Sequence, residues 1–184
     1  METERKILTM AYDAPCGSLT LGAVDGHLCL CDWRAEGAAE CERRLRRLGT
    51  RARVEEGPSE ATARAAEQLD RFFRGELRAF DLPLLLAGTA FQQRVWRELG
   101  RIPYGETVSY GELARRLGSP RAVRAVARAV GANLLSILLP CHRVIGAGRS
   151  LAGYRGGLPA KAWLLALEAR EISRQTRGAI RVGK

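Results

Sequence analysis

The residues best suited to chemistry lie in one short segment, Pro140-Cys141-His142-Arg143-Val144. Cysteine attacks as the thiolate, and a neighbouring base or cation, here His142 and Arg143, makes the thiolate easier to form. His142 can take the thiol proton, directly or through a water molecule. On residue types alone, a nucleophilic Cys141 and a cysteine that only fills the core both remain open.

Two further polar residues flank this segment. Asn133 precedes the apolar run Leu134–Leu139, and Glu168 closes a predicted amphipathic helix, Lys161–Glu168. A carboxylate at position 168 could orient His142 by accepting its second ring proton, although an ordinary exposed helix residue is the alternative. The glycine-rich stretch 152–157 predicts a loop that could bring its backbone and the ring of Tyr154 close to a ligand.

The preceding segment predicts two short helices. Ser109 and Glu112 match the capping-box pattern, which starts a helix that ends at Gly118. Ser119-Pro120 predicts the start of a second helix that runs to about Ala132. Two helices joined by a short glycine-containing turn are typical of a helix-turn-helix.

The second of these helices is expected to have two distinct faces. At helical spacing, one face carries Arg121, Arg124 and Arg128. The opposite face carries Val123, Val126 and Val130. A solvated arginine surface is the plain interpretation. The capped helix before it and the charge of this half favour nucleic acid binding.

The first half of the chain has a different pattern. Three strands are predicted at Ile7–Ala14, Ser18–Val24 and His27–Trp33, and a helix at Glu60–Arg74. Asp25-Gly26 is a strong hairpin signal. Glu76–Ala87 is expected to be a linker. We therefore expect an α/β domain at 1–87 and a mostly α-helical domain at 88–184.

Composition narrows the class of protein. The 184 residues carry a net charge of +10. Residues 1–87 hold 13 basic and 15 acidic side chains, whereas residues 88–184 hold 17 and 5. The basic second half predicts a polyanion as partner. No secretory leader or membrane-length apolar run is visible, so a cytoplasmic protein is expected.

Five cysteines cannot all pair with one another. His27, Cys29 and Cys31 alternate along a predicted strand, which would place them on one face of the sheet. They do not match a paired zinc-ligand pattern, so buried thiols are favoured over a metal site.

The segment Ile137–Ile145 resembles the active-site motif of the O6-alkylguanine-DNA alkyltransferases. The resemblance extends in order from about Thr89 to Glu168, and the first half is similar in length and layout to bacterial members. It implies a ribonuclease-H-like N-terminal domain and a winged-helix-like DNA-binding domain. It also implies a monomer that repairs O6-alkylguanine in double-stranded DNA and needs no organic cofactor or catalytic metal. O4-alkylthymine is a second candidate substrate.

The same resemblance implies roles for single residues. Cys141 would accept the alkyl group once and irreversibly, and His142 would act as base with Glu168 holding it. Asn133 would support the turn between the second predicted helix and the active-site strand, which the apolar run Leu134–Leu139 would form. Tyr110 would press on the target phosphate and protonate the departing guanine. DNA and substrate contacts would come from Arg124, which fills the space of the flipped base, and from Arg121, Arg128, Ser119, Tyr154, Val144 and Arg155.

One departure from the family and two rival functions stay open. Family members often have Asn-Pro where this chain has Asn133-Leu134, which leaves the shape of the turn undetermined. A DNA-binding regulator would need no reactive Cys141. A cysteine hydrolase would use Cys141 and His142 but would turn over and ignore DNA.

Overall fold

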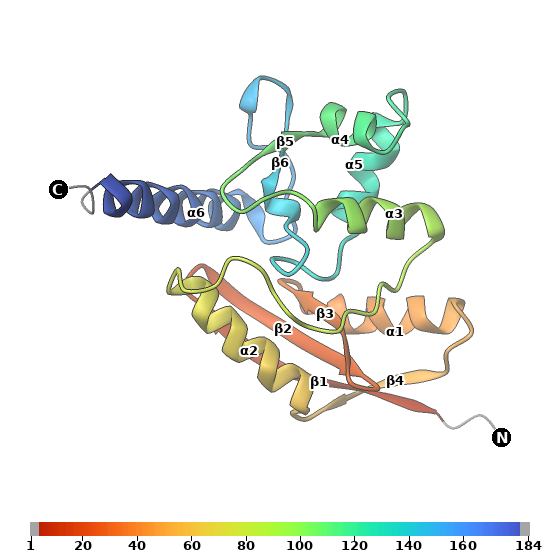
Figure 1. The fold of residues 1–184 in the computed structure, drawn as a ribbon. Coiled ribbons are helices and arrows are strands. Elements are labelled where there is room, and N and C mark those ends of the chain that lie inside the picture. Colours follow the sequence, from red (N-terminus) through yellow and green to blue (C-terminus); the bar gives the residue numbers. More distant parts are fainter. Residues whose placement is uncertain (1–3, 181–184) are drawn as a thin grey trace.

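A four-stranded sheet with a helix on each face forms the N-terminal half of the protein (Figure 1). The computed structural model describes residues 4–180. The elements of this half are β1 (Arg5–Ala14), β2 (Gly17–Val24), β3 (His27–Asp32), α1 (Gly37–Arg47), β4 (Ala52–Glu56) and α2 (Glu60–Phe73). The strand order is β3-β2-β1-β4, with β4 parallel to β1 and the other neighbours antiparallel.

The three predicted strands and the helix at 60–74 are present. Asp25 and Gly26 have φ of 49° and 77°, as the central residues of a tight two-residue hairpin require. The sequence interpretation missed α1 and β4. Most of α1 is charged, and its buried face is reduced to Gly37, Cys41 and Leu45, one residue per turn.

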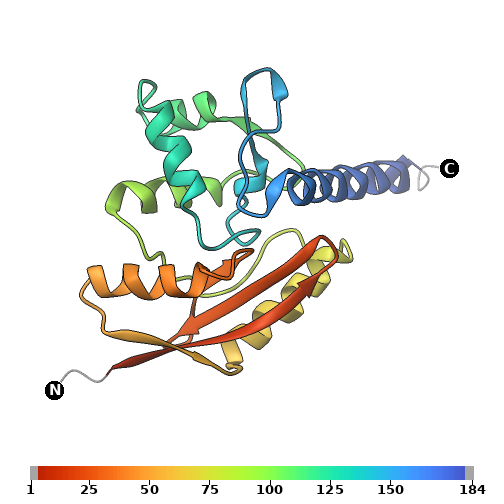
Figure 2. The ribbon, with the colours of Figure 1, turned by 180° about the vertical axis from the view of Figure 1, so that it is seen from behind.

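The two helices cover opposite faces of the sheet (Figure 2). On the α2 side, Leu69 and Phe72 pack with Leu19 and Leu21 of β2 in the main core. On the α1 side, a smaller cluster joins α1 to β3, β1 and β4. The main core also contains Trp96 and many other side chains from the C-terminal half, so the two halves share one hydrophobic core.

The C-terminal half is mostly helical and lies on the β3 side of the sheet (Figures 1 and 2). Its elements are α3 (Ala90–Leu99), β5 (Val108–Ser109), α4 (Tyr110–Arg116), α5 (Val123–Gly131), the 3-10 turn η1 (Cys141–Arg143), β6 (Val144–Ile145), the 3-10 turn η2 (Ala147–Arg149) and α6 (Gly157–Ile180). Among the described residues, no helix is long and apolar enough to cross a membrane.

The second helix of the pair α4–α5 starts later than expected. We expected Ser119 to cap it, but α5 begins at Val123, and its N-cap Ala122 makes no side-chain capping bond. Residues 119–122 instead form a turn closed by the Ala122 N–H to the Ser119 carbonyl, 2.9 Å. Arg121 therefore lies before the helix, and only Arg124 and Arg128 share its exposed face.

The outer edge of β3 ties later parts of the chain to the sheet. Near its start, Leu28 exchanges backbone hydrogen bonds with Pro83 and Leu85 of the linker. Near its end, the Cys31 N–H donates to Leu134 O at 2.7 Å, and the Ser136 N–H donates to Cys31 O at 2.8 Å. The segment just before Cys141 is thus hydrogen-bonded directly to the N-terminal sheet.

Candidate active site

The apolar run before Cys141 forms a buried turn and not the strand that we expected. Asn133 closes this turn at both ends: its Oδ1 accepts from the Leu135 N–H at 2.9 Å, and its Nδ2 donates to Leu139 O at 3.0 Å. Ile137 sits inside with φ of 70°, a conformation that a β-branched residue rarely adopts. In the described part of the chain, only two backbone hydrogen bonds join this segment to Cys31 of β3, and the two Asn133 hydrogen bonds close it on itself. Both features favour a turn over an extended strand.

Cys141 lies at one wall of a cavity of about 560 Å³. The thiol residue is only 5% exposed. The cavity is lined by Arg34, Tyr110, Ala127, Arg128, Val130, Gly131, Cys141, Ala152, Gly153, Tyr154 and Arg155. Burial raises the pKa of the Cys141 thiol, although the Asn133 side chain and the charge of Lys161 offset part of that rise. The resting cysteine is therefore protonated at neutral pH.

Behind Cys141, one buried carboxylate organises the site. Glu168 accepts from His142 Nε2 at 2.8 Å and from the Gly105 N–H at 2.8 Å. It also accepts from Arg143, whose Nε lies 3.0 Å from Oε2 and whose Nη2 lies 3.0 Å from Oε1. Burial alone would raise the pKa of Glu168, but these bonds outweigh it and lower that pKa. The group is ionised.

His142 is placed to act as a base. Burial lowers its pKa below the usual 6.5, against the opposing effect of Glu168, so the ring is neutral at pH 7. With Nε2–H donating to Glu168, the lone pair lies on Nδ1. Nδ1 is buried and has no hydrogen-bond partner among the described residues. The ring thus has one free acceptor next to Cys141 in the chain.

Arg143 does something other than we expected from its position. Its place near Cys141 in the sequence predicts a cation that favours the thiolate. Its guanidinium instead binds Glu168, and its Nη1 donates to Ile102 O at 2.6 Å. Arg143 therefore ties η1 to α6 and to the loop after α3.

Sequence interpretation missed Lys161, which is fully buried in α6. Its ammonium donates to the carbonyls of Val144 at 2.6 Å, Ala152 at 2.8 Å and Gly153 at 3.4 Å. It thereby holds the glycine-rich loop against β6. The signal was present, because Lys161, Leu164 and Glu168 recur at helical spacing on the face that is buried.

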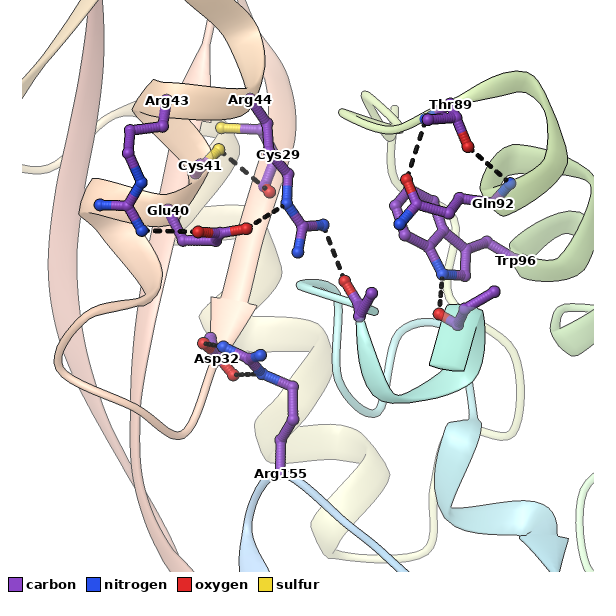
Figure 3. A network of polar contacts seen from close by, with 12 residues as sticks. Cys29, Asp32, Glu40, Cys41, Arg43, Arg44, Thr89, Gln92, Trp96 and Arg155 are labelled. Atoms are coloured by element: carbon purple, nitrogen blue, oxygen red, sulfur yellow. Dashed lines mark hydrogen bonds and ion pairs between the residues drawn. The ribbon is translucent and has the colours of Figure 1, made fainter. Parts of the chain in front are cut away.

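The N-terminal half contributes a second restraint on the same loop (Figure 3). Asp32, at the end of β3 and fully buried, forms a two-point ion pair with Arg155. The neighbouring Trp33 donates from Nε1 to the Tyr154 hydroxyl at 3.2 Å. A Cβ on Gly156 would come within 2.7 Å of the Trp33 ring, so only glycine fits there. These contacts join residues more than 120 positions apart, so no local sequence pattern predicts them.

The C-terminal end of α5 is also held from outside (Figure 3). Arg44 of α1 donates from Nη1 to Ala132 O at 2.7 Å, and Trp96 of α3 donates from Nε1 to Ala129 O at 2.8 Å. Glu40 binds Arg44 from behind at 2.7 Å. A cation at a helix C-terminus also complements the helix dipole. Both halves therefore orient α5.

The cavity brings together only some of the expected site residues. Cys141, Tyr110, Arg128, Tyr154 and Arg155 line it. His142, Glu168 and Asn133 lie behind Cys141 as buried supports, and the buried Val144 takes part through its carbonyl to Lys161. Arg124 is exposed on α5 outside the lining, and Arg121 and Ser119 lie in the turn before that helix.

The remaining cysteines lie in the N-terminal half. Cys29, Cys31 and Cys41 are buried, as expected for the first two, whereas His27 is exposed. Cys29 and Cys31 belong to different core clusters, so the expected common face is wrong. Gly22 pairs with Leu30 and Ala23 with Leu28, which leaves Cys29 as an extra residue in β3 that breaks the alternation of that strand. No group of three metal-binding side chains occurs among residues 4–180.

Known proteins match both the second half and the whole fold. The family model for the 6-O-methylguanine DNA methyltransferase DNA-binding domain matches residues 90–170. A methylated-DNA–protein-cysteine methyltransferase of Mycolicibacterium paratuberculosis is 58% identical over 110 residues, which are 60% of this chain and 67% of that protein.

Solved structures extend the match to the N-terminal half. The crystal structure of Mycobacterium tuberculosis OGT in complex with DNA is 42% identical, with a TM-score of 0.75, over 90% of this chain and 94% of that one. The O6-methylguanine-DNA methyltransferase of Pyrococcus kodakaraensis shares the fold at 21% identity and a TM-score of 0.67, over 88% and 98%.

Fold and site together define a class of protein: an α/β half joined to a mostly helical half that carries a two-helix unit beside a buried, histidine-backed cysteine. The comparisons then assign it. The chain belongs to the methylated-DNA–protein-cysteine methyltransferase family.

Proposed function

We propose that this protein repairs DNA by transferring an alkyl group from the O6 of guanine to Cys141, and that each molecule does so once. The observation that carries this proposal is the buried Cys141 at the wall of a cavity beside α5, backed by the neutral His142 and the ionised Glu168. Membership of the family supports the same activity.

The reaction needs one proton transfer and one displacement. His142 takes the Cys141 proton at Nδ1, directly or through a water molecule. The thiolate sulfur then forms a bond to the alkyl carbon, and the bond from that carbon to O6 breaks with its electron pair left on guanine. Burial raises the pKa of Tyr110, so its hydroxyl is protonated at neutral pH and can donate to the departing base. The proton held by His142 then returns through solvent to the Tyr110 oxygen. In sum, the thiol proton replaces the alkyl group, and the thioether cannot easily be reversed.

The other residues serve binding and support. We assign Arg124 to the space left by the extruded nucleotide, and Arg121, Arg128 and Ser119 to contacts with DNA. Tyr154 and the backbones of Val144 and Arg155 would form the guanine pocket, and Asn133 and Glu168 would support Cys141 and His142. The chemistry requires no cofactor or catalytic metal.

The finer description of the fold and setting is also proposed. The mixed sheet order supports a ribonuclease-H-like domain at 1–87. The α4–α5 pair beside the β5–β6 ribbon supports a winged-helix-like domain at 88–184. We propose a cytoplasmic monomer whose partner is double-stranded DNA that contains O6-alkylguanine.

Intact mass tests the proposed function. After incubation with excess methylated duplex, the protein should gain one methyl group, about 14 Da, because the acceptor is a single side chain. A DNA-binding regulator would gain nothing, and a cysteine hydrolase would consume substrate repeatedly without a lasting gain. Continued turnover would overturn the proposal.

DNA binding should depend steeply on salt. The basic second half carries 17 arginines and lysines against 5 acidic residues. Phosphate contacts release counterions, so the logarithm of affinity for undamaged duplex should fall linearly with the logarithm of salt concentration, with little sequence preference. A titration by fluorescence anisotropy at several salt concentrations measures this. Salt-independent or strongly sequence-selective binding would contradict it.

Replacement of Arg124 by alanine should separate base extrusion from chemistry. Arg124 is exposed on α5 opposite the buried Val126 and Val130, so the change should leave the fold intact. Extrusion costs a few kcal/mol, and loss of the side chain that offsets it should slow repair in duplex by about tenfold or more. Single-turnover reaction with free O6-benzylguanine should change much less. Equal slowing of both reactions would assign Arg124 to the pocket or the fold.

A further inference from the structure

The N-terminal half reaches the mouth of the Cys141 cavity at one residue. Of the described residues that line the cavity, only Arg34 comes from before α3. It lies two residues after the end of β3, and its side chain is exposed. An exposed side chain at the rim of a reactive cavity can contact whatever enters that cavity.

The backbone at Arg34 is held in place although its side chain is free to move. Asp32 is buried and bound to Arg155, and Trp33 is bound to Tyr154 and packed on Gly156. On the other side, the Arg34 carbonyl accepts from the Gly37 N–H at 3.0 Å. The Cα of Arg34 is therefore positioned relative to the same loop that lines the cavity.

The guanidinium of Arg34 is available for an anion. None of the ion pairs found within the described part of the chain includes Arg34, and Asp32, two residues earlier, is taken by Arg155. Arg128 of α5 lines the same cavity and likewise forms no ion pair there. Of the three arginines that line the cavity, Arg155 is paired with Asp32. Arg34 and Arg128, one from each half of the protein, are the two whose permanent charges have no ion-pair partner among the described residues.

The proposed DNA substrate indicates which anion Arg34 would bind. A nucleotide whose base enters the cavity keeps a phosphate on each side of its sugar outside it. Arginine binds phosphate through paired N–H donors. We propose that Arg34 binds a backbone phosphate next to the extruded nucleotide, so that the N-terminal half takes part in holding the substrate. This inference rests on the proposed function.

The test compares two substrates. In Arg34→Gln, single-turnover repair of a duplex with one O6-methylguanine should slow by about tenfold at low salt, as for loss of one hydrogen-bonded charge. Reaction with free O6-benzylguanine, which has no phosphate, should stay at the wild-type rate. Equal slowing on both substrates would overturn the inference, since Arg34 would then shape the pocket.

Salt dependence supplies the second measurement. In a Cys141→Ser background, the log–log slope of duplex affinity against salt should become shallower by about one for Arg34→Gln. Arg34→Lys should keep the slope, because it keeps the charge. Arg64→Gln is the matched control: it removes an exposed arginine from α2, away from the cavity, and should change neither rate nor slope.

The two proposals fail in different ways. If the wild-type protein takes up no alkyl group, the proposed function is wrong whatever Arg34 does. If the wild type reacts and Arg34→Gln matches Arg64→Gln in rate and slope, only the role of Arg34 is wrong.

Discussion

The Cys141→Ser variant is expected to gain no alkyl group from either methylated duplex or free O6-benzylguanine. A serine hydroxyl holds its proton far more tightly than a thiol, and His142, whose pKa is lowered by burial, is too weak a base to remove it. The change replaces one small buried atom, so folding and DNA affinity should persist. Intact mass and a duplex-binding titration on the same sample would show loss of chemistry with binding retained.

Cys16→Ser is the matched control for this loss. Cys16 is the only other cysteine of the described residues that is not fully buried, which makes it the strongest competitor for a label. Burial nevertheless raises the pKa of its thiol to about 11, so it is almost wholly protonated at neutral pH. The control should take up one methyl group as the wild type does. An alkyl group found on Cys16, Cys29, Cys31 or Cys41 would contradict Cys141 as the acceptor.

Local pattern was enough to predict much of the fold. Alternating apolar residues and the Asp25-Gly26 turn predicted β1 to β3. The capping pattern at Ser109 predicted the start of α4, where the Ser109 side chain accepts from the Glu112 N–H. The misses have physical reasons. The buried face of α1 is one residue wide, and the apolar run before Cys141 forms a turn because β3 and Asn133 hold it from both sides.

The sequence likewise predicted some residues of the candidate site and missed others. Cys141 and His142 adjoin in sequence, so their types alone suggested the chemistry. Lys161 and Asp32 escaped notice because their function depends on partners that only the folded chain supplies: three carbonyls for one and Arg155 for the other. The position of Arg143 near Cys141 in the sequence suggested that its charge acts on the thiol, whereas its guanidinium binds Glu168.

Glu168→Gln is expected to damage both the reaction and the fold. The carboxylate is fully buried and accepts from His142, Arg143 and the Gly105 N–H. An amide cannot accept all of these bonds, and it leaves the Arg143 charge buried without a counter-ion. Loss of one partner of a buried ion pair costs about 3–5 kcal/mol. For a chain of this length, the melting temperature should fall by about 10 °C.

Glu171→Gln on the same helix separates this effect from loss of any carboxylate. Glu171 is also mostly buried, but its partners Arg170 and Arg174 are exposed, so this variant should lose about 1 kcal/mol or less. Thermal unfolding of the two variants and the wild type measures the difference. Similar losses for both variants would contradict a special place for Glu168.

The stability difference should also depend on pH in a defined direction. Folding lowers the pKa of Glu168 from its usual 4.5, so its stabilisation is complete above pH 4.5 and is lost as the pH falls through the lower value of the folded state. Wild type and Glu168→Gln should therefore converge in stability in acid.

Activity gives the second measurement on Glu168→Gln. At a temperature where circular dichroism shows the variant folded, its reaction with free O6-benzylguanine should remain strongly slowed, because the His142 ring has lost the carboxylate charge that raises its basicity. A folded variant that reacts at the wild-type rate would show that Glu168 supports the fold alone and that His142 needs no carboxylate behind it.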